Sequence, residues 1–144
     1  MLIGEYTHTL DPKKRISLPA KFRKELGKTV VITRGLDNCV SLYPISAWKA
    51  TTEKLAEMSM GQAGSRDFSR FMLTGAQEVD VDSAGRILIP DFLKDFAGLK
   101  TKVVLAGVHN RVELWNEKSW SEYKKRVQKQ ADVLAEKLGD LGMI

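Results

Sequence analysis

The chain has 144 residues, of which 43% are hydrophobic and 28% charged, and its formal net charge is +5, as is typical of a soluble globular protein. No apolar run approaches the roughly 18 residues that a membrane-spanning helix needs, and the first residues lack the basic and apolar segments of a secretory signal. Cys39 is the single cysteine, which excludes an internal disulfide, so we expect a cytoplasmic protein without a membrane partner.

The chain contains two copies of one unit, which run from Leu2 to Trp48 and from Leu73 to Trp120. The segment DPKKRISLP at 11–19 returns 71 positions later as DSAGRILIP at 82–90. Identical residues are spread along both copies, which is hard to obtain by chance. A repeat of this kind predicts two copies of one structural unit.

Each copy predicts the same series of elements. In the first copy these are a strand over 2–10, a turn over 11–15, a strand over 16–18, a short helix from Pro19 that Gly27 ends, a buried strand over 30–32, a loop over 35–38 and a strand over 40–43. The second copy predicts strands over 78–82, 87–89, 103–105 and 112–115, with a turn over 82–86, a helix from Pro90 that Gly98 ends and a loop over 107–110.

A longer helix follows each copy. We expect Ser46 to cap a helix that continues to Met58, a glycine-containing break over 60–64, and a further helical turn or two over 68–72. After the second copy, apolar residues at three- and four-residue spacing predict an amphipathic helix, with a stripe of Trp120, Tyr123, Val127, Ala131, Leu134 and Leu138. Lining the protein's own core is the favoured role for this stripe, and packing against a neighbouring subunit is the alternative.

One copy alone is too small to fold comfortably, because small domains bury only about 60% of their surface. We therefore expect the copies to interlock into one sheet or barrel around a pseudo-two-fold axis, which gives an α+β fold with flanking helices. The expected units are a first repeat at 1–50, linking helices at 51–72, a second repeat at 73–116 and a C-terminal helix at 117–144.

Basic residues are concentrated in the first copy. Residues 11–34 hold eight basic and two acidic residues, a net charge of +6, whereas residues 80–111 hold five basic and four acidic residues, a net charge of +1. A basic patch attracts polyanions, although a solvated surface explains the charge about as well.

The sequence does not predict an enzyme. His8 and His109 do not correspond in the repeat, and no metal-binding, nucleophile or phosphate-loop motif occurs. Asp80 and Asp82, two apart on a predicted strand, could hold a cation, but a solvated pair is the better interpretation. We expect no cofactor, no metal and no small-molecule substrate.

The Asp-x-x-x-Arg turn recurs in both copies. Asp11 and Asp82 are predicted to structure the turns, since a short carboxylate accepts backbone N–H bonds and pairs with the arginine four residues on. The planar guanidinium of Arg15 or Arg86 suits phosphate and the edge of guanine. Arg15 follows two lysines at the tip of a predicted hairpin, and a two-stranded ribbon fits a major groove.

These paired turns, each running into an Ile-x-[Leu/Ile]-Pro stretch, resemble the MraZ family of bacterial transcriptional regulators, which are built from two tandem AbrB-like swapped-hairpin half-barrels. The resemblance covers nearly the whole chain. It implies a ring-shaped homo-oligomer, nucleoid association, and repression by binding short direct repeats upstream of the division and cell-wall gene cluster that contains the regulator's own gene. One departure is that Lys14 occupies a place before Arg15 that is usually glycine.

The resemblance implies that Asp11 to Arg15 contacts double-stranded DNA, and that Asp82 to Arg86 is the second copy of the motif. In this hypothesis Arg15 reads bases, Arg86 forms a second site or serves assembly, and the phosphate contacts are Lys13, Lys14, Lys21 and Arg23. One alternative is an oligomeric protein-interaction or antitoxin-like module that binds through its terminal helix. A second alternative is an enzyme with an unrecognised site.

Overall fold

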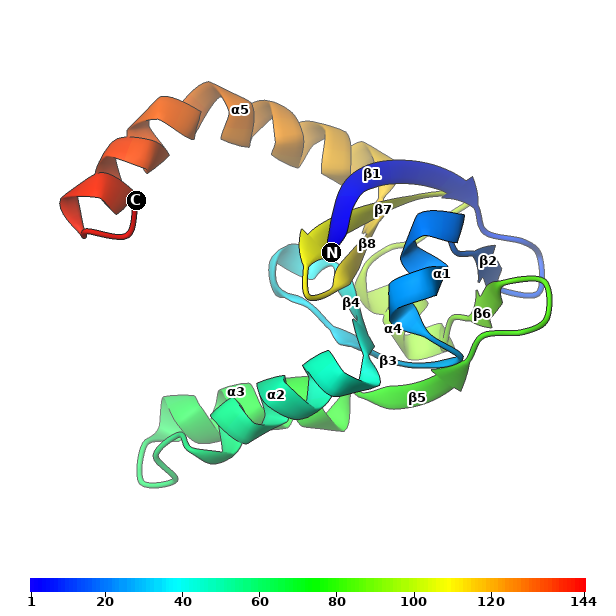
Figure 1. The fold of residues 1–144 in the computed structure, drawn as a ribbon, viewed down its shortest axis with the longest axis horizontal. Helices are drawn as coiled ribbons and strands as arrows, with labels where there is room; N and C mark the ends of the chain where they lie inside the picture. Colours follow the sequence, from blue (N-terminus) through cyan, green and yellow to red (C-terminus); the bar gives the residue numbers. More distant parts are fainter.

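The structure is a computed structural model that describes all 144 residues, and it has an α+β fold (Figure 1). The elements of the first copy are β1 (Leu2–Thr9), β2 (Arg15–Ser17), α1 (Ala20–Leu26), β3 (Thr29–Arg34), a 3-10 turn (Leu36–Asn38) and β4 (Val40–Pro44). Two helices follow, α2 (Ile45–Ala56) and α3 (Ala63–Thr74). The second copy contains β5 (Gln77–Asp80), β6 (Arg86–Leu88), α4 (Asp91–Phe96), β7 (Lys102–His109) and β8 (Val112–Asn116), and α5 (Glu117–Asp140) ends the chain.

The strands form a six-stranded antiparallel sheet in the order β1-β7-β8-β4-β3-β5 and a two-stranded ribbon of β2 and β6. The equivalent strands of the two copies are β1 and β5, β3 and β7, and β4 and β8. Exchanging each strand for its equivalent gives the same order read from the other end, so the sheet is pseudo-symmetric. The first strand of each copy pairs within the other copy, since β1 pairs with β7 and β5 pairs with β3. The copies therefore interlock around a pseudo-two-fold axis, which confirms that prediction.

The strands on either side of each Asp-x-x-x-Arg turn do not pair with each other as a hairpin. Instead β2 pairs with β6 across the axis, with Ile16 opposite Ile87 at the centre. Two equivalent backbone bonds extend this pairing, from the Leu18 N–H to the Gly85 carbonyl at 2.9 Å and from the Ile89 N–H to the Lys14 carbonyl at 2.8 Å. Each turn is thus held by the other copy.

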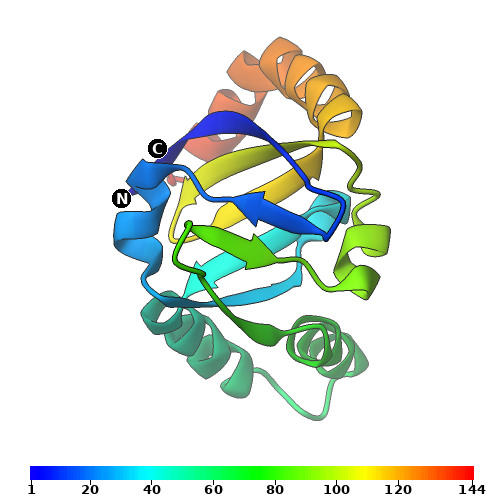
Figure 2. The same ribbon diagram turned by 90° about the vertical axis from the view of Figure 1, so that its right-hand side faces the viewer.

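One hydrophobic core lies between the large sheet, the ribbon and the short helices α1 and α4 (Figure 2). Its 19 buried residues come from both copies, often at equivalent positions such as Phe22 and Leu93. Tyr6 of β1 packs edge-on against Phe22, with ring centroids 5.2 Å apart. Because both copies contribute to this one core, neither copy alone could bury its apolar side chains, as expected for units this small.

Several local predictions were wrong. Pro44 and not Ser46 occupies the N-cap of α2, no side chain caps it, and the helix ends at Ala56, short of Met58. Helix α3 has 12 residues, more than the turn or two expected. The predicted loop at 107–110 is largely strand, because β1 pairs with β7 as far as His109.

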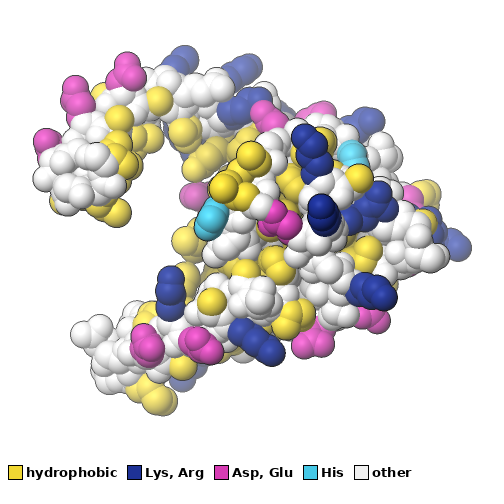
Figure 3. Space-filling view, viewed as in Figure 1, with side chains coloured by type: hydrophobic (Ala, Val, Ile, Leu, Met, Phe, Trp, Pro, Cys, Tyr) yellow, Lys and Arg dark blue, Asp and Glu magenta, His cyan; other side chains and the backbone are white.

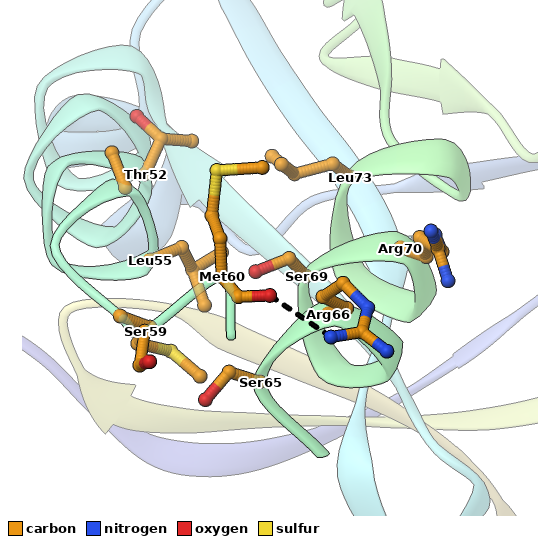
Figure 4. A pocket seen from close by; sticks show the side chains of 11 residues that line it. Thr52, Leu55, Ser59, Met60, Ser65, Arg66, Ser69, Arg70 and Leu73 are labelled. Atoms are coloured by element: carbon orange, nitrogen blue, oxygen red, sulfur yellow. Dashed lines mark hydrogen bonds between the residues drawn. The ribbon is translucent and has the colours of Figure 1, made fainter. Parts of the chain in front are cut away.

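The α2–α3 hairpin is attached to the body at the N-terminal end of α2 and the C-terminal end of α3 (Figure 1). The Thr33 hydroxyl donates to the Met72 carbonyl at 2.6 Å, and Arg34 Nη1 donates to the Phe71 carbonyl at 3.0 Å. Further from the body, a pocket of about 410 Å³ separates the two helices (Figure 4). Its lining includes apolar and basic residues, among them Leu55, Met58, Met60, Leu73, Arg66 and Arg70.

Helix α5 starts against the sheet and then leaves it (Figure 1). Asn116 caps its N-terminus by accepting from the Ser119 N–H at 3.0 Å, while Trp120 and Tyr123 pack on Trp115 at centroid distances of 5.3 and 4.9 Å. Every residue from 131 onward is exposed, and Figure 3 shows hydrophobic side chains on the side of α5 that faces the hollow between this helix and the α2–α3 hairpin. The stripe therefore lines the protein's own core only at its start, and the expectation was wrong for Ala131, Leu134 and Leu138. None of the five helices is both long and apolar enough to span a membrane.

Candidate nucleic-acid interface

The ribbon of β2 and β6 has one face toward the core and one toward solvent (Figure 2). Ile16 and Ile87 are buried beneath it. Because successive strand residues point to opposite faces, the residues that point outward are Arg15, Ser17, Arg86 and Leu88. Arg15 lies opposite Leu88, and Arg86 lies opposite Ser17. The two arginines are therefore diagonal neighbours, and the Cα atoms of such neighbours are about 7–8 Å apart. Both arginines therefore emerge on one face.

The first turn is organised by the carboxylate of Asp11. Its Oδ1 accepts from the backbone N–H groups of Lys13 and Arg15, each at 2.9 Å, and its Oδ2 accepts from Arg15 Nε at 3.1 Å. The Lys14 N–H donates to the Asp11 carbonyl at 2.9 Å. Because Nε faces the carboxylate, the terminal Nη1 and Nη2 groups of Arg15 remain available to a ligand.

The second turn repeats this arrangement. Oδ1 of Asp82 accepts from the backbone N–H groups of Ala84 and Arg86 at 2.9 Å, and Oδ2 accepts from Arg86 Nε at 3.0 Å. Gly85 has φ +77°, and at the equivalent place Lys14 has φ +62°. Lys14 thus adopts the left-handed conformation that glycine would provide, and replacing glycine by lysine leaves the turn and its arginine in the same geometry.

The two aspartates are held in their charged form. The pKa of Asp11 is lowered first by the backbone N–H of Arg15, with further contributions from the Arg15 side chain and the Lys13 N–H. The pKa of Asp82 is lowered in the same way by the Arg86 backbone N–H and side chain. Each turn therefore contains a fixed carboxylate that orients the arginine beside it.

The other predicted contacts divide between the two turns. Lys13 is exposed and in no ion pair, whereas the Lys14 ammonium contacts the Asp91 carboxylate, which partly neutralises it. Lys21 is exposed on α1. Arg23, also on α1, lies over the second turn, where a Cβ added to Gly85 would overlap its guanidinium. The fold thus places Arg23 beside Arg86 and not beside Arg15.

Three further basic residues lie beside the turns, and the sequence did not single them out. Lys94 and Lys100 of the second copy border the first turn, and Lys28 of the first copy borders the second turn. Their positions depend on how the copies interlock, which no local pattern in the sequence specifies.

The expected aspartate pair is not a strand pair. Strand β5 ends at Asp80, which accepts from the Thr29 hydroxyl at 3.1 Å, and Asp82 lies in the turn with Arg86. No group of three or more His, Cys, Asp or Glu side chains is arranged to hold a metal ion.

Comparison with known proteins gives the family. The family model described as "MraZ protein, putative antitoxin-like" matches residues 1–71 and again residues 72–139. The chain belongs to the MraZ family. Among MraZ relatives, the "Transcriptional regulator MraZ" of Natranaerobius thermophilus is 44% identical over 140 residues, covering 97% of this chain and 98% of the relative. The protein of the same name from Clostridium beijerinckii is 46% identical over 143 residues, covering 99% and 100%.

These MraZ relatives are named for a regulatory role and not for an enzymatic one. Among solved structures, "The solution structure of PHS018 from pyrococcus horikoshii" aligns with a TM-score of 0.33 at 17% identity, covering 79% of this chain and 88% of that chain. A likeness this weak does not bear on fold or function.

Proposed function

We propose that this MraZ family member is a DNA-binding transcriptional regulator of the cytoplasm and nucleoid. It represses by binding short direct repeats upstream of the bacterial division and cell-wall gene cluster that includes its own gene. The names of its relatives support the regulatory role. The family resemblance set out above is the basis for the repeats, the gene cluster and repression.

The observation that carries the proposal is the outward face of the ribbon, from which Arg15 and Arg86 both emerge. A two-stranded ribbon fits the major groove, where an arginine fork binds the O6 and N7 atoms of guanine. The bond from Nε to Asp11 or Asp82 fixes each side chain before DNA arrives, which lowers the entropy lost on binding. Arg15, with Lys13 beside it, is the principal reader, and Arg86 is the second.

Assembly follows from the parts of the molecule outside the two repeats. Residues 1–50 and 73–116 form the DNA-binding body, and residues 51–72 and 117–144 carry the contacts between subunits. On the distal part of α5, Leu134 and Leu138 are 40% and 38% exposed, although apolar residues of this size are usually covered. Docking this stripe on the next subunit is a head-to-tail contact, and such contacts form a ring when the rotation between neighbouring subunits closes.

In this proposal the α2–α3 pocket of the next subunit takes up the distal part of α5. Its apolar lining is bordered by Arg66 and Arg70 (Figure 4). The distal helix, residues 131–140, carries three acidic residues and one basic residue around its leucines, namely Asp132, Glu136, Asp140 and Lys137, so its net charge is negative. One ribbon contacts little DNA, so several ribbons on one ring engage repeated sites at high effective concentration. Exchanging Leu134 and Leu138 for serine is expected to reduce the molar mass in solution to that of a single chain, measured by light scattering. An unchanged mass would contradict this mode of assembly.

Fluorescence anisotropy tests the proposed function. DNA from upstream of the protein's own gene is titrated against scrambled DNA over a series of salt concentrations. Wild-type protein is expected to prefer the upstream DNA, and Arg15→Ala is expected to reduce that preference about 5- to 150-fold, since one bidentate contact discriminates by about 1–3 kcal/mol. Arg86→Ala is expected to have a smaller effect of the same kind. Lys49→Ala on α2 is the control, because it removes one positive charge away from the ribbon and outside the segments that join subunits.

A protein-interaction or antitoxin-like module is the second candidate, and the exposed distal half of α5 favours it. Such a module would bind upstream and scrambled DNA equally and would lose its partner when α5 is shortened. A chain ending after Val127 keeps the packing of Trp120 and Tyr123 and removes only the exposed half. If that chain still prefers upstream DNA in the anisotropy assay, the helix serves assembly; if the full-length chain shows no preference, the module is favoured.

A further inference from the structure

Each turn lies against the loop that precedes a central strand of the other copy. The Leu10 N–H donates to the Thr101 carbonyl at 2.8 Å, just before the first turn. The Val81 N–H donates to the Lys28 carbonyl at 2.8 Å, just before the second turn. These equivalent bonds bring basic residues of one copy beside the DNA-reading turn of the other.

Beside the first turn, residues of both copies line an open groove of about 770 Å³. Its charged members are Asp11, Lys14, Lys94 and Lys100. Asp11 is paired with Arg15, and Lys14 is paired with Asp91. Lys94 and Lys100 are in no ion pair, so the groove keeps two uncompensated positive charges, both from the second copy.

Beside the second turn, a smaller groove of about 290 Å³ is lined by Arg23 and Lys28 of the first copy together with Asp82, Ser83 and Gly85. Asp82 is paired with Arg86, and neither Arg23 nor Lys28 is in an ion pair. Both are exposed. This groove likewise keeps two uncompensated positive charges, here from the copy opposite to the turn.

We propose that these four cations form a crossed phosphate clamp, with Lys94 and Lys100 at one end of the ribbon and Arg23 and Lys28 at the other. The clamp rests on the proposed DNA-binding function and adds residues that hold the backbone. Each ribbon strand has three residues and is about 10 Å long, close to the roughly 12 Å width of the major groove. A ribbon in the groove therefore presents its two ends to the phosphates of opposite walls.

The two copies have different roles at each end of the clamp. At each end, one copy supplies the arginine that faces the base edges, and the other copy supplies the cations that hold the phosphates. Contacts to phosphate fix the position of a protein on DNA but do not select a sequence. The clamp residues therefore set affinity and salt dependence, and Arg15 and Arg86 set preference.

The test is the salt dependence of full-length variants. Each phosphate neutralised contributes about 0.9 to the slope of log affinity against log salt. Exchanging both Lys94 and Lys100 for alanine is expected to reduce the slope by about 1.8 for each ribbon bound, on upstream and scrambled DNA alike, with the ratio of the two affinities unchanged. Exchanging Arg23 and Lys28 is expected to have the same effect. The control exchanges Lys49, which is exposed on α2 and lies outside the segments that join subunits, and is expected to keep the wild-type slope, because α2 lies away from the ribbon (Figure 1).

Lys94 is half-buried, so the same pair is also exchanged for glutamine, which keeps most of the stem and removes the charge. A slope equal to that of the control on both DNAs would overturn the clamp. That result would leave the proposed function intact if upstream DNA is still preferred. A wild-type protein without preference would instead contradict the proposed function, and the slopes on scrambled DNA would still decide whether these four residues hold phosphates.

Discussion

The two copies have similar side chains at the axis, where they share a core, and different ones away from it. Ile16 and Ile87 are both buried and face each other across the axis, as members of one core. By contrast, Lys14 corresponds to Gly85, and the buried Cys39 corresponds to Arg111, which is paired with Glu113 at 3.1 Å. A residue that packs on its own counterpart cannot change without disturbing both copies. Residues away from the axis are free of that constraint, which is where the copies have diverged in charge.

The largest expected effect concerns Cys39. Burial raises the pKa of its thiol to about 12 from an ordinary value of 9.0. Three pKa units reduce the thiolate fraction at pH 8 about a thousandfold, and the thiolate is the reactive species. Native protein is therefore expected to react with a disulfide reagent about a thousandfold more slowly than protein in denaturant, as measured by absorbance. A fast reaction in the native state would show that the first copy opens at this point.

The next effect tests the shared core. Ile16→Ala and Ile87→Ala are each expected to destabilise the protein by about 2–5 kcal/mol, because each leaves a cavity under the ribbon. The two losses should agree within about 1 kcal/mol in urea unfolding, and the double variant should depart from their sum, since neighbours couple. A large loss in one copy and a small loss in the other would contradict a symmetric core.

A smaller effect separates the two turns. Gly85→Lys is expected to destabilise the protein by about 1–3 kcal/mol, because it adds a side chain to a residue with left-handed backbone conformation, and this side chain also overlaps Arg23. Lys14→Gly is expected to stabilise it by only about 0.5 kcal/mol, since relief at φ +62° is partly offset by chain entropy and by the lost contact with Asp91. Thermal unfolding measures both. Equal and opposite changes would mean that Arg23 tolerates a side chain there.

The smallest effect is common to both turns. Asp11 and Asp82 have lowered pKa values, so their contribution to stability is present above the unfolded value of about 3.9 and is lost as pH falls through the folded value. Asp11→Asn and Asp82→Asn are expected to lower the urea midpoint slightly at pH 7. Their difference from wild type should shrink as the pH falls through the folded value. A difference that persists in acid would assign the effect to shape and not to charge.

The repeat allowed much of the fold to be predicted. The alternating residues of 2–10 and the proline and glycine around 19–27 placed strands and helices in order, because those signals are local. The partner of each strand could not be predicted. The apolar residues at Ile16 and Ile87 suit a hairpin within one copy as well as a ribbon between copies, and only the packed core selects the second.

The residues of the candidate site were likewise only partly predictable from the sequence. Asp11 and Arg15 could be identified because their hydrogen bonds join residues at most four apart. Lys94 and Lys100 could not, because they reach the first turn through pairing between residues about 90 apart. The unburied half of α5 was also missed, since a periodic stripe predicts an apolar face without saying what covers it.

The pairing of β1 with β7 also governs how the chain must be made. Leu2 pairs with His109, so β1 leaves the ribosome about 100 residues before its partner, which at 5–20 residues per second is a wait of roughly 5–20 s. During that time an unpaired strand edge is open to other chains. Its polar residues Glu5, Thr7 and Thr9 limit aggregation of the waiting strand. Neither copy can complete its sheet during synthesis, and folding becomes a late event that involves nearly the whole chain.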